Sequence, residues 1–336
     1  LESLIDSLGH AEGTKYLFID EIQNVEDFEE VVNAYRGTGE YSVFITGSNS
    51  YLLSGELVTK LTGRYVEFEL FPLSFDEYLD MKAFLGKEVN ANLLIELNNY
   101  LQEGGFPKAM QYDDFADKRT YVRSVIDEIF EKDIKRRVKV RNVETFNNVR
   151  NFIINNFGAT VSVKSLQEAL AKNGIELKHA TLSRYIEVLL QSKILYQCDR
   201  FDMKSKRALS GEKKYYLADI SFYFATNTDN RINYGPALEN MVYVYAKSLD
   251  YSVSVGRIGK LECDFILRDN KLDYCYVQVA YTIGESKSTE DREYAPLESI
   301  ADNYPKYVLT TDYLLQNRNG IKHVNLLEFM KNRSSF

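Results

Sequence analysis

Acidic, hydroxyl and amide side chains follow two short apolar stretches near the start of the chain. Asp20 and Glu21 come directly after the run 16–19, and Ser48 and Asn49 follow the run 41–46. An aspartate in this position can hold a magnesium ion, directly or through water, and the next glutamate can polarise water for attack on a γ-phosphate. A hydroxyl or amide nearby can hydrogen bond to that phosphate. The residues therefore predict nucleotide hydrolysis, with Asp20 as metal ligand, Glu21 as base and Ser48 or Asn49 as sensor. The alternative is that two strands simply end in polar residues.

These side chains can act together only if the strands before them are neighbours in one parallel sheet. The run 16–19 is short and apolar, as a buried parallel strand requires, and the run 41–46 has strand composition. Between them, apolar residues recur at i, i+3, i+4 and i+7, which predicts one buried face of a helix: Phe28, Val31, Val32 and Tyr35. We therefore predict a βαβ unit whose strands end side by side, where ligands of open α/β sheets bind.

The same landmarks resemble those of AAA-type P-loop ATPases. The segment 16–21 is similar to their Walker B strand, 46–50 to their sensor strand, and Gly63-Arg64 to the position of an arginine used on phosphate. The segment 71–78 follows as in one bacterial and archaeal branch that ends in a nuclease-like domain. The resemblance implies ATP and magnesium as cofactors of the intact protein, Arg64 as a phosphate contact in its own or a neighbouring subunit, and self-association through the ATPase core.

A phosphate-binding loop of the form Gly-x-x-x-x-Gly-Lys-Ser/Thr is absent from the sequence. Gly86-Lys87 is followed by a glutamate and Gly259-Lys260 by a leucine, so neither pair fits. Because the backbone N–H groups of such a loop wrap the phosphates, we expect this chain alone neither to hold ATP well nor to be an active enzyme, and we expect no cofactor for it. The sequence opens on Leu1, so we expect an N-terminal truncation; a natural loss of the loop is the alternative.

Length and composition are typical of a soluble globular protein with two or three domains. The chain has 336 residues, of which 45% are hydrophobic and 27% charged. No apolar run approaches the roughly 20 residues that span a bilayer, which predicts a cytoplasmic protein with no membrane partner. Three cysteines and three histidines share no metal-ligand spacing. The net charge of −8 disfavours indiscriminate binding to nucleic acid, but a whole-chain sum can hide a basic face.

The predicted organisation is α/β, with four parts. A truncated P-loop ATPase core covers 1–72, a helical lid 73–142, a winged helix 143–217 and a restriction-endonuclease-like domain 218–336. Ser74 and Glu77 form a capping-box pattern at the start of a lid helix, and helical stretches 92–102 and 117–138 follow. Six basic residues between Lys132 and Arg141 indicate either a solvated helix end or a phosphate contact.

The predicted winged helix combines three amphipathic helices with a hairpin. The helices cover 144–157, 163–173 and 179–192, and the strands 193–198 and 214–217. Segment 181–185 begins the helix expected to lie in a DNA groove, which assigns Arg184 to base edges. Lys204, Lys206 and Arg207 fall at the turn of the wing. From 164 to 214 there are eleven basic and six acidic residues, a net charge of +5, which favours duplex DNA as a partner. The alternative is a winged helix that only packs against neighbouring domains.

The last part resembles the core of PD-(D/E)xK nucleases. A helix follows 235–240, and strands are expected at 251–255, 262–267, 274–281 and 306–310. Such a site needs carboxylates on a metal and a lysine that activates water. Glu239 and Asp264 match the first two acids, but the third position is Gln278, followed by valine and alanine, so neither the carboxylate nor the lysine is present. We therefore predict a nuclease-like fold with a degenerate site and no nuclease activity. The two acids would then fix local structure through N–H groups or basic neighbours: Arg257, Lys260 and Arg268.

Two functions fit these predictions. The first is a fragment of an AAA-type ATPase that, when intact, hydrolyses ATP and acts on DNA through its winged helix. The second is a non-catalytic DNA-binding or protein-interaction module in which the α/β remnant is only a platform. An upstream coding sequence that contains the phosphate-binding loop would favour the first.

Overall fold

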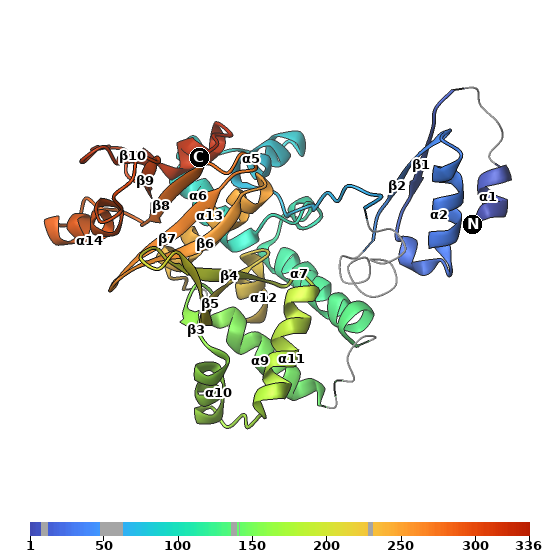
Figure 1. Ribbon diagram of the computed structural model, residues 1–336, viewed down its shortest axis with the longest axis horizontal. Helices are drawn as coiled ribbons and strands as arrows, with labels where there is room; N and C mark the ends of the chain where they lie inside the picture. The colour runs from blue at the N-terminus through green and yellow to red at the C-terminus, as the bar shows by residue number, and fades with distance from the viewer. Residues whose placement is uncertain (8–12, 48–62, 136–139, 141, 228–230) are drawn as a thin grey trace.

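Two parts of unequal size make up the chain. The structure is a computed structural model and describes residues 1–7, 13–47, 63–135, 140, 142–227 and 231–336 (Figure 1). The N-terminal part, residues 1–47, contains a two-stranded sheet, and the rest forms a body around an eight-stranded mixed sheet. None of the helices in the described ranges is both long and apolar enough to cross a membrane.

The N-terminal part is a βαβ unit with one additional helix. Strands β1 (Lys15–Ile19) and β2 (Tyr41–Ile45) are parallel, and α2 (Phe28–Gly37) connects them. The prediction from the sequence is confirmed because the apolar stripe of α2 packs Phe28 and Val32 against the sheet. Helix α1 (Glu2–Ser7) packs beside them through Ile5. The opposite sheet face is exposed and carries three stacked rings: Tyr16, Phe18 and Phe44.

An extended segment, residues 63–72, leads from this part to the helices of the body. These are α5 (Phe75–Phe84), α6 (Leu93–Glu103) and α7 (Phe115–Ile129), with a π-helical turn at Phe130–Ile134. Helix α5 begins as predicted, because Glu77 accepts a hydrogen bond from the Ser74 N–H at 2.9 Å. Helix α7 starts two residues before the predicted position, since Asp114 provides its N-cap by accepting a bond from the Ala116 N–H.

Three helices and three strands come next. The helices are α9 (Val143–Asn155), α10 (Val163–Lys172) and α11 (His179–Gln191), within two residues of the predicted bounds. The strands are β3 (Thr160–Val161), β4 (Leu195–Asp202) and β5 (Arg207–Leu217), ordered β3-β5-β4 and antiparallel. The β4–β5 hairpin is longer than predicted, because charged residues between Cys198 and Lys214 also pair across it.

The hairpin belongs to the same sheet as the C-terminal strands. Strand β4 pairs in parallel with β6, which gives the sheet order β10-β9-β8-β7-β6-β4-β5-β3. The remaining strands are β6 (Ser252–Ile258), β7 (Leu261–Arg268), β8 (Tyr274–Val279), β9 (Lys306–Thr310) and β10 (Lys322–Asn325). The C-terminal helices are α12 (Ser221–Thr226), α13 (Tyr234–Ser248), α14 (Lys287–Glu298) and α15 (Leu326–Lys331). The β4–β6 pairing was not predicted from the sequence.

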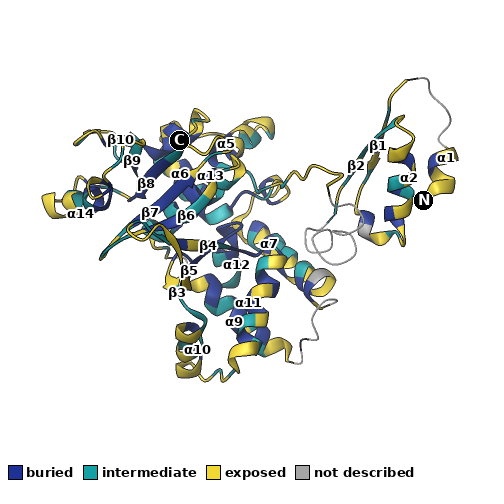
Figure 2. Cartoon of the chain, in the orientation of Figure 1, coloured by how far each residue is buried: buried dark blue, intermediate teal, exposed yellow. Residues whose placement is uncertain are grey.

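One apolar core runs through the whole body. It extends from Phe75 in α5 through Leu182 in α11 to Met330 in α15, and buried residues fill the centre of the body in Figure 2. A smaller cluster on the other side of the C-terminal sheet includes Tyr276 and is covered by Tyr294 and Leu297 of α14. The apolar residues of 1–47 form two clusters of their own. The helices 73–135 therefore share a core with the C-terminal part.

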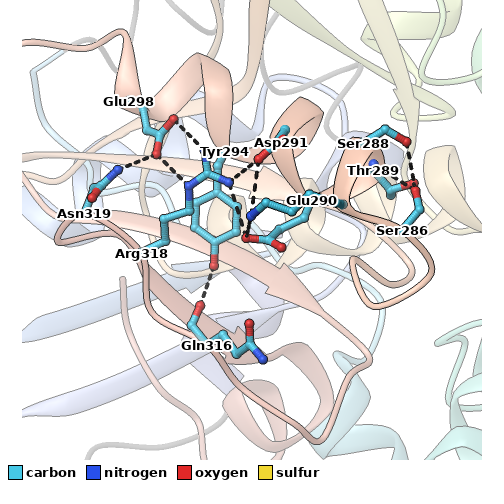
Figure 3. A network of polar contacts seen from close by, with 11 residues as sticks. Ser286, Ser288, Thr289, Glu290, Asp291, Tyr294, Glu298, Gln316, Arg318 and Asn319 are labelled. Atoms are coloured by element: carbon cyan, nitrogen blue, oxygen red, sulfur yellow. Dashed lines mark hydrogen bonds and ion pairs between the residues drawn. The ribbon is translucent and has the colours of Figure 1, made fainter.

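A charged network joins α14 to the segment before β10 (Figure 3). The Arg318 guanidinium donates to Glu298 at 2.8 Å and to Glu290 at 3.3 Å, and it also bonds to Asp291. It lies over the ring of Tyr294, 5.2 Å from the centroid. This network fixes α14 against the segment that leads into β10.

Candidate functional site

Asp20, Glu21 and Thr46 meet at the carboxyl edge of β1 and β2. The strand register pairs Ile19 with Ile45, so the residues that follow the strands are adjacent. The Thr46 hydroxyl donates to Asp20 Oδ1 and accepts from the Glu21 backbone N–H at 3.1 Å. All three polar residues are solvent exposed. The predicted meeting of the two strand ends is therefore confirmed.

The polar partner that the structure describes for Asp20 is Thr46. Ser48 and Asn49 lie outside the described residues, so their role as a sensor stays a prediction. The sequence analysis treated Thr46 only as part of a strand, although the parallel register would have placed it opposite Asp20. Arg64 is exposed on the extended segment after the second strand, and within the described ranges no hydrogen bond or ion pair joins it to Asp20.

A fixed backbone turn presents the carboxylates. Glu21 has φ 51° and ψ 50°, in the left-handed region, and begins a short 3₁₀ turn, Ile22–Asn24. The Ile22 N–H donates to the Thr46 carbonyl at 3.0 Å, and the Thr46 N–H donates to the Ile19 carbonyl at 2.9 Å. A left-handed non-glycine residue costs about 1–3 kcal/mol, which these bonds to β2 offset.

These residues fit one side of a nucleotide site. Carboxylate and hydroxyl oxygens are suitable ligands for Mg²⁺, directly or through water. The sequence holds no loop whose N–H groups would wrap the phosphates. In the part of the chain that the structure describes, no three His, Cys, Asp or Glu side chains are placed to hold a metal together. The described residues therefore account for the carboxylate side of such a site, and the phosphate side requires residues that the sequence does not contain.

The basic residues assigned to DNA lie in two places. Lys204 and Lys206 are exposed in the turn between β4 and β5, where the wing was predicted to turn, and Arg207 is exposed at the first residue of β5. Arg184 is on α11 and pairs with Glu187 at 2.7 Å, so its charge is partly neutralised by its own helix. Of the basic segment before Arg141, Lys132 and Lys135 form i,i+4 pairs with glutamates of the same helical stretch.

A buried lysine neutralises the acids of the predicted nuclease-like site. Lys214 Nζ on β5 lies 2.9 Å from Glu239 Oε2 on α13 and 3.0 Å from Glu262 Oε1 on β7. The Tyr216 hydroxyl also donates to Glu239 Oε2, at 3.1 Å. Residues 214 and 216 share one side of β5 because side chains alternate along a strand. The ammonium therefore joins three elements of the body.

The pKa values around this lysine follow from burial and charge. Burial disfavours the ammonium of Lys214, but Glu239, Asp264 and Glu262 outweigh burial, so the pKa of Lys214 is raised. Burial, followed by repulsion from Glu239, raises the pKa of Asp264 well above its ordinary value. Asp264 Oδ2 accepts the Val279 N–H at 2.8 Å, which is the N–H contact that the sequence analysis expected for an acid in this place.

Gln278 has both ends of its amide engaged. Its oxygen accepts the Asp264 N–H at 3.3 Å, and its nitrogen donates to Glu293 of α14 at 2.9 Å. The basic neighbours expected for the acids, Arg257, Lys260 and Arg268, make no ion pair with a described residue. That expectation was wrong: the alternation of β5 turns Lys214 inward, and Lys214 is closer to the acids than any of the three.

The three cysteines are structural. Cys198, Cys263 and Cys275 are unpaired and buried in the body. Burial raises the pKa of Cys198 and of Cys275 to about 12, so both thiols stay protonated near neutral pH. A protonated, buried thiol is neither a nucleophile nor a metal ligand.

Comparisons with known proteins give two domain matches. Residues 1–79 match a family described as an AAA domain, and residues 94–231 match a domain of unknown function (DUF8612).

Two relatives and one solved structure are similar to larger parts of the chain. An uncharacterized protein of Haemophilus influenzae is 33% identical over 317 residues, which cover 94% of this chain and 77% of that protein. The uncharacterized protein MJ1544 of Methanocaldococcus jannaschii is 29% identical over 287 residues, 83% of this chain but less than two thirds of that protein, 64%. The Walker-type ATPase PABY2304 of Pyrococcus abyssi has a TM-score of 0.42 and 15% identity, covering 67% of this chain and 65% of that one.

Proposed function

This chain belongs to the same family as the Haemophilus influenzae protein, and from that premise and its match to an AAA domain we propose that it is part of an ATPase. The observation that carries the proposal is the hydrogen-bonded meeting of Asp20, Glu21 and Thr46 at one sheet edge. A nucleotide with magnesium, when bound, would supply the γ-phosphate for transfer to water and a cation to neutralise it.

Each residue at this edge has a distinct task. Asp20 is positioned by the Thr46 hydroxyl and would hold the cation or its water shell. Glu21, on a turn fixed by β2, would accept the proton of the attacking water. Ser48 or Asn49 would report on the phosphate. Arg64 would contact phosphate in its own subunit or in a neighbouring one, and the second case requires self-association through the ATPase core.

The test is made on the complete gene product, including any residues before Leu1 that contain the phosphate-binding loop. We expect Mg²⁺-dependent ATP hydrolysis that Glu21→Gln lowers by a factor of about 10²–10⁴, the usual contribution of a general base, while ATP binding persists. Glu26→Gln is the matched control, since Glu26 is an exposed glutamate of the same segment. Unchanged turnover in Glu21→Gln, or a complete product without the loop, would refute the ATPase proposal.

A second part of the proposal concerns the body. We propose that 143–217 form a winged helix that contacts duplex DNA, preceded by a lid at 73–142, and that 218–336 form a nuclease-like domain without nuclease activity. The element order α9-β3-α10-α11-β4-β5 supports the winged helix. The engagement of Glu239 by Lys214 and of Gln278 by Glu293 supports the loss of nuclease chemistry. Three unpaired buried thiols are consistent with a cytoplasmic location.

The alternative is a non-catalytic DNA-binding or protein-interaction module. The observation that favours it is the sequence itself, which lacks the loop for phosphates. A complete gene product that binds DNA but fails to bind ATP would establish this alternative.

A further inference from the structure

Two β-turns from different parts of the body lie side by side. The β4–β5 turn follows Asp202, and the β6–β7 turn lies between Arg257 and Leu261. Parallel pairing places Asp202 beside Arg257, and the Met203 N–H donates to the Arg257 carbonyl at 3.0 Å. A Cβ added to Gly259 in the second turn would lie 3.7 Å from Lys204 Nζ in the first. The two turns therefore form one continuous surface.

This surface concentrates positive charge without an ion pair to a described residue, although Asp202 balances part of it: the Lys204 N–H and, to a smaller extent, the Arg257 charge lower the pKa of Asp202. Five basic side chains are exposed on it: Lys204, Lys206, Arg207, Arg257 and Lys260. None of the five makes an ion pair with any residue in the described ranges. The chain as a whole has a net charge of −8, so the patch opposes the overall balance.

The basic residues further along β4 and β5 are paired. Arg200 bonds to Glu262 at 2.9 Å and also to Glu212, and Lys213 pairs with Asp199 at 2.8 Å. The acid nearest the turns, Asp202, accepts the Lys204 backbone N–H at 3.0 Å. At this end of the sheet, the cations without an ion pair to a described residue therefore lie at the two turns.

The spread of the five cations suits a row of phosphates better than a single small anion. They come from the β4–β5 turn, the start of β5, the end of β6 and the β6–β7 turn. Neighbouring strands are about 4.8 Å apart, so the row extends over about 10–15 Å. Neither turn contains an aromatic residue that could stack on an unpaired base: 202–207 and 257–261. Contact with the backbone of a duplex, without sequence readout, is the recognition that these residues favour.

We propose that the β4–β5 and β6–β7 turns together form one phosphate-backbone contact for duplex DNA, in which Arg257 and Lys260 act with the wing residues. This inference rests on the proposed contact between the body and DNA. The DNA-binding surface is then made by two parts of the chain that the β4–β6 pairing holds together. Arg184 on α11 lies outside this contact.

The test measures how binding of the full chain to a duplex of arbitrary sequence depends on salt. Five phosphate contacts predict a slope of log K against log salt of about −4.5, and removal of two contacts predicts about −2.7. For Arg257→Gln with Lys260→Gln, the affinity deficit relative to the wild type should therefore widen about 12-fold between 200 mM and 50 mM salt.

A matched control removes the same two charges from the other end of β7. Arg268→Gln with Lys271→Gln deletes one exposed arginine and one exposed lysine that make no ion pair with a described residue, and it should keep the wild-type slope. Circular dichroism establishes that both variants are folded.

The outcomes separate the inference from the proposal on which it rests. A wild-type chain that does not bind duplex DNA at 50 mM salt refutes both. Wild-type binding with equal slopes for Arg257→Gln/Lys260→Gln and the control refutes the two-turn contact alone. A wild-type chain that binds single-stranded RNA but not duplex DNA likewise refutes both.

Discussion

Replacement of Lys214 by methionine tests whether its ammonium is the counter-ion of the buried acids. The lysine side chain is 7% exposed, and its Nζ lies within 3.0 Å of Glu239 and Glu262. Methionine keeps most of the buried volume but removes the charge. The acids, including the buried Asp264, are then left without the cation that balances them.

The expected loss in free energy of unfolding is about 3–5 kcal/mol at neutral pH, since breaking a buried pair leaves an uncompensated charge. The pKa of Lys214 is raised in the folded state, so its stabilisation is complete below its ordinary pKa of 10.5 and disappears only as the pH rises through the higher folded value. In the variant, carboxylates must take up protons to relieve repulsion. The loss should therefore be smaller at pH 5 than at pH 8, and protonation of Asp264, whose pKa is already raised, should contribute first.

Urea denaturation followed by circular dichroism at pH 8 and pH 5 measures both effects. Lys271→Met is the control, because Lys271 is exposed and its replacement should change stability by at most about 0.5 kcal/mol. Adding Glu239→Gln to Lys214→Met should recover about 1–3 kcal/mol relative to the sum of the two single changes. A Lys214→Met protein as stable as the control at pH 8, or additive single and double changes, would refute the counter-ion role.

Two further predictions concern the body. Gly104→Ala should lower the free energy of unfolding by well over 3 kcal/mol, because Gly104 has φ +76° and a Cβ there would lie 2.0 Å from Asp219 Oδ1. Gly174→Ala, at φ +78° in open space, should lower the free energy of unfolding only by the backbone strain of about 1–2 kcal/mol. Equal losses in urea denaturation would contradict the close approach. Arg318→Ala should loosen the attachment of α14 and speed amide exchange in that helix, and Arg318→Lys should recover less than half of the lost protection, because an ammonium cannot bond in the forked geometry of guanidinium. Unchanged exchange in α14 would contradict this role.

Local patterns in the sequence were sufficient for the N-terminal unit. An apolar run, a helical stripe and a second run define β1, α2 and β2, and polar residues after each strand predict the shared edge. The register between β1 and β2 could not be predicted from these patterns. Once Ile19 is paired with Ile45, Thr46 must lie opposite Asp20, so the contact follows from strand alignment and not from residue type.

Long-range pairing explains what the sequence did not show in the body. The sequence pattern of 195–198 predicts a strand, but it does not predict with which strand it pairs. In the structure β4 pairs with β6, which lies more than fifty residues later. The same limit applies to Lys214. Alternation along β5 places Lys214 on the same side as Tyr216, yet only the tertiary fold brings Glu239 of α13 to meet both.

The segment 63–72 connects the proposed nucleotide-binding part to the proposed DNA surface through one strand, β4. Glu69 pairs with Lys193 at 2.6 Å and accepts the Tyr196 hydroxyl at 2.7 Å, which attaches the segment 63–72 to the start of β4. The other end of β4, Asp202, enters the basic turns. Eight residues of strand span about 26 Å, and β4 is hydrogen-bonded on both sides, to β5 and β6. A displacement of the segment 63–72 must therefore either break the Glu69 contacts or carry the body, with its basic turns, along as one unit.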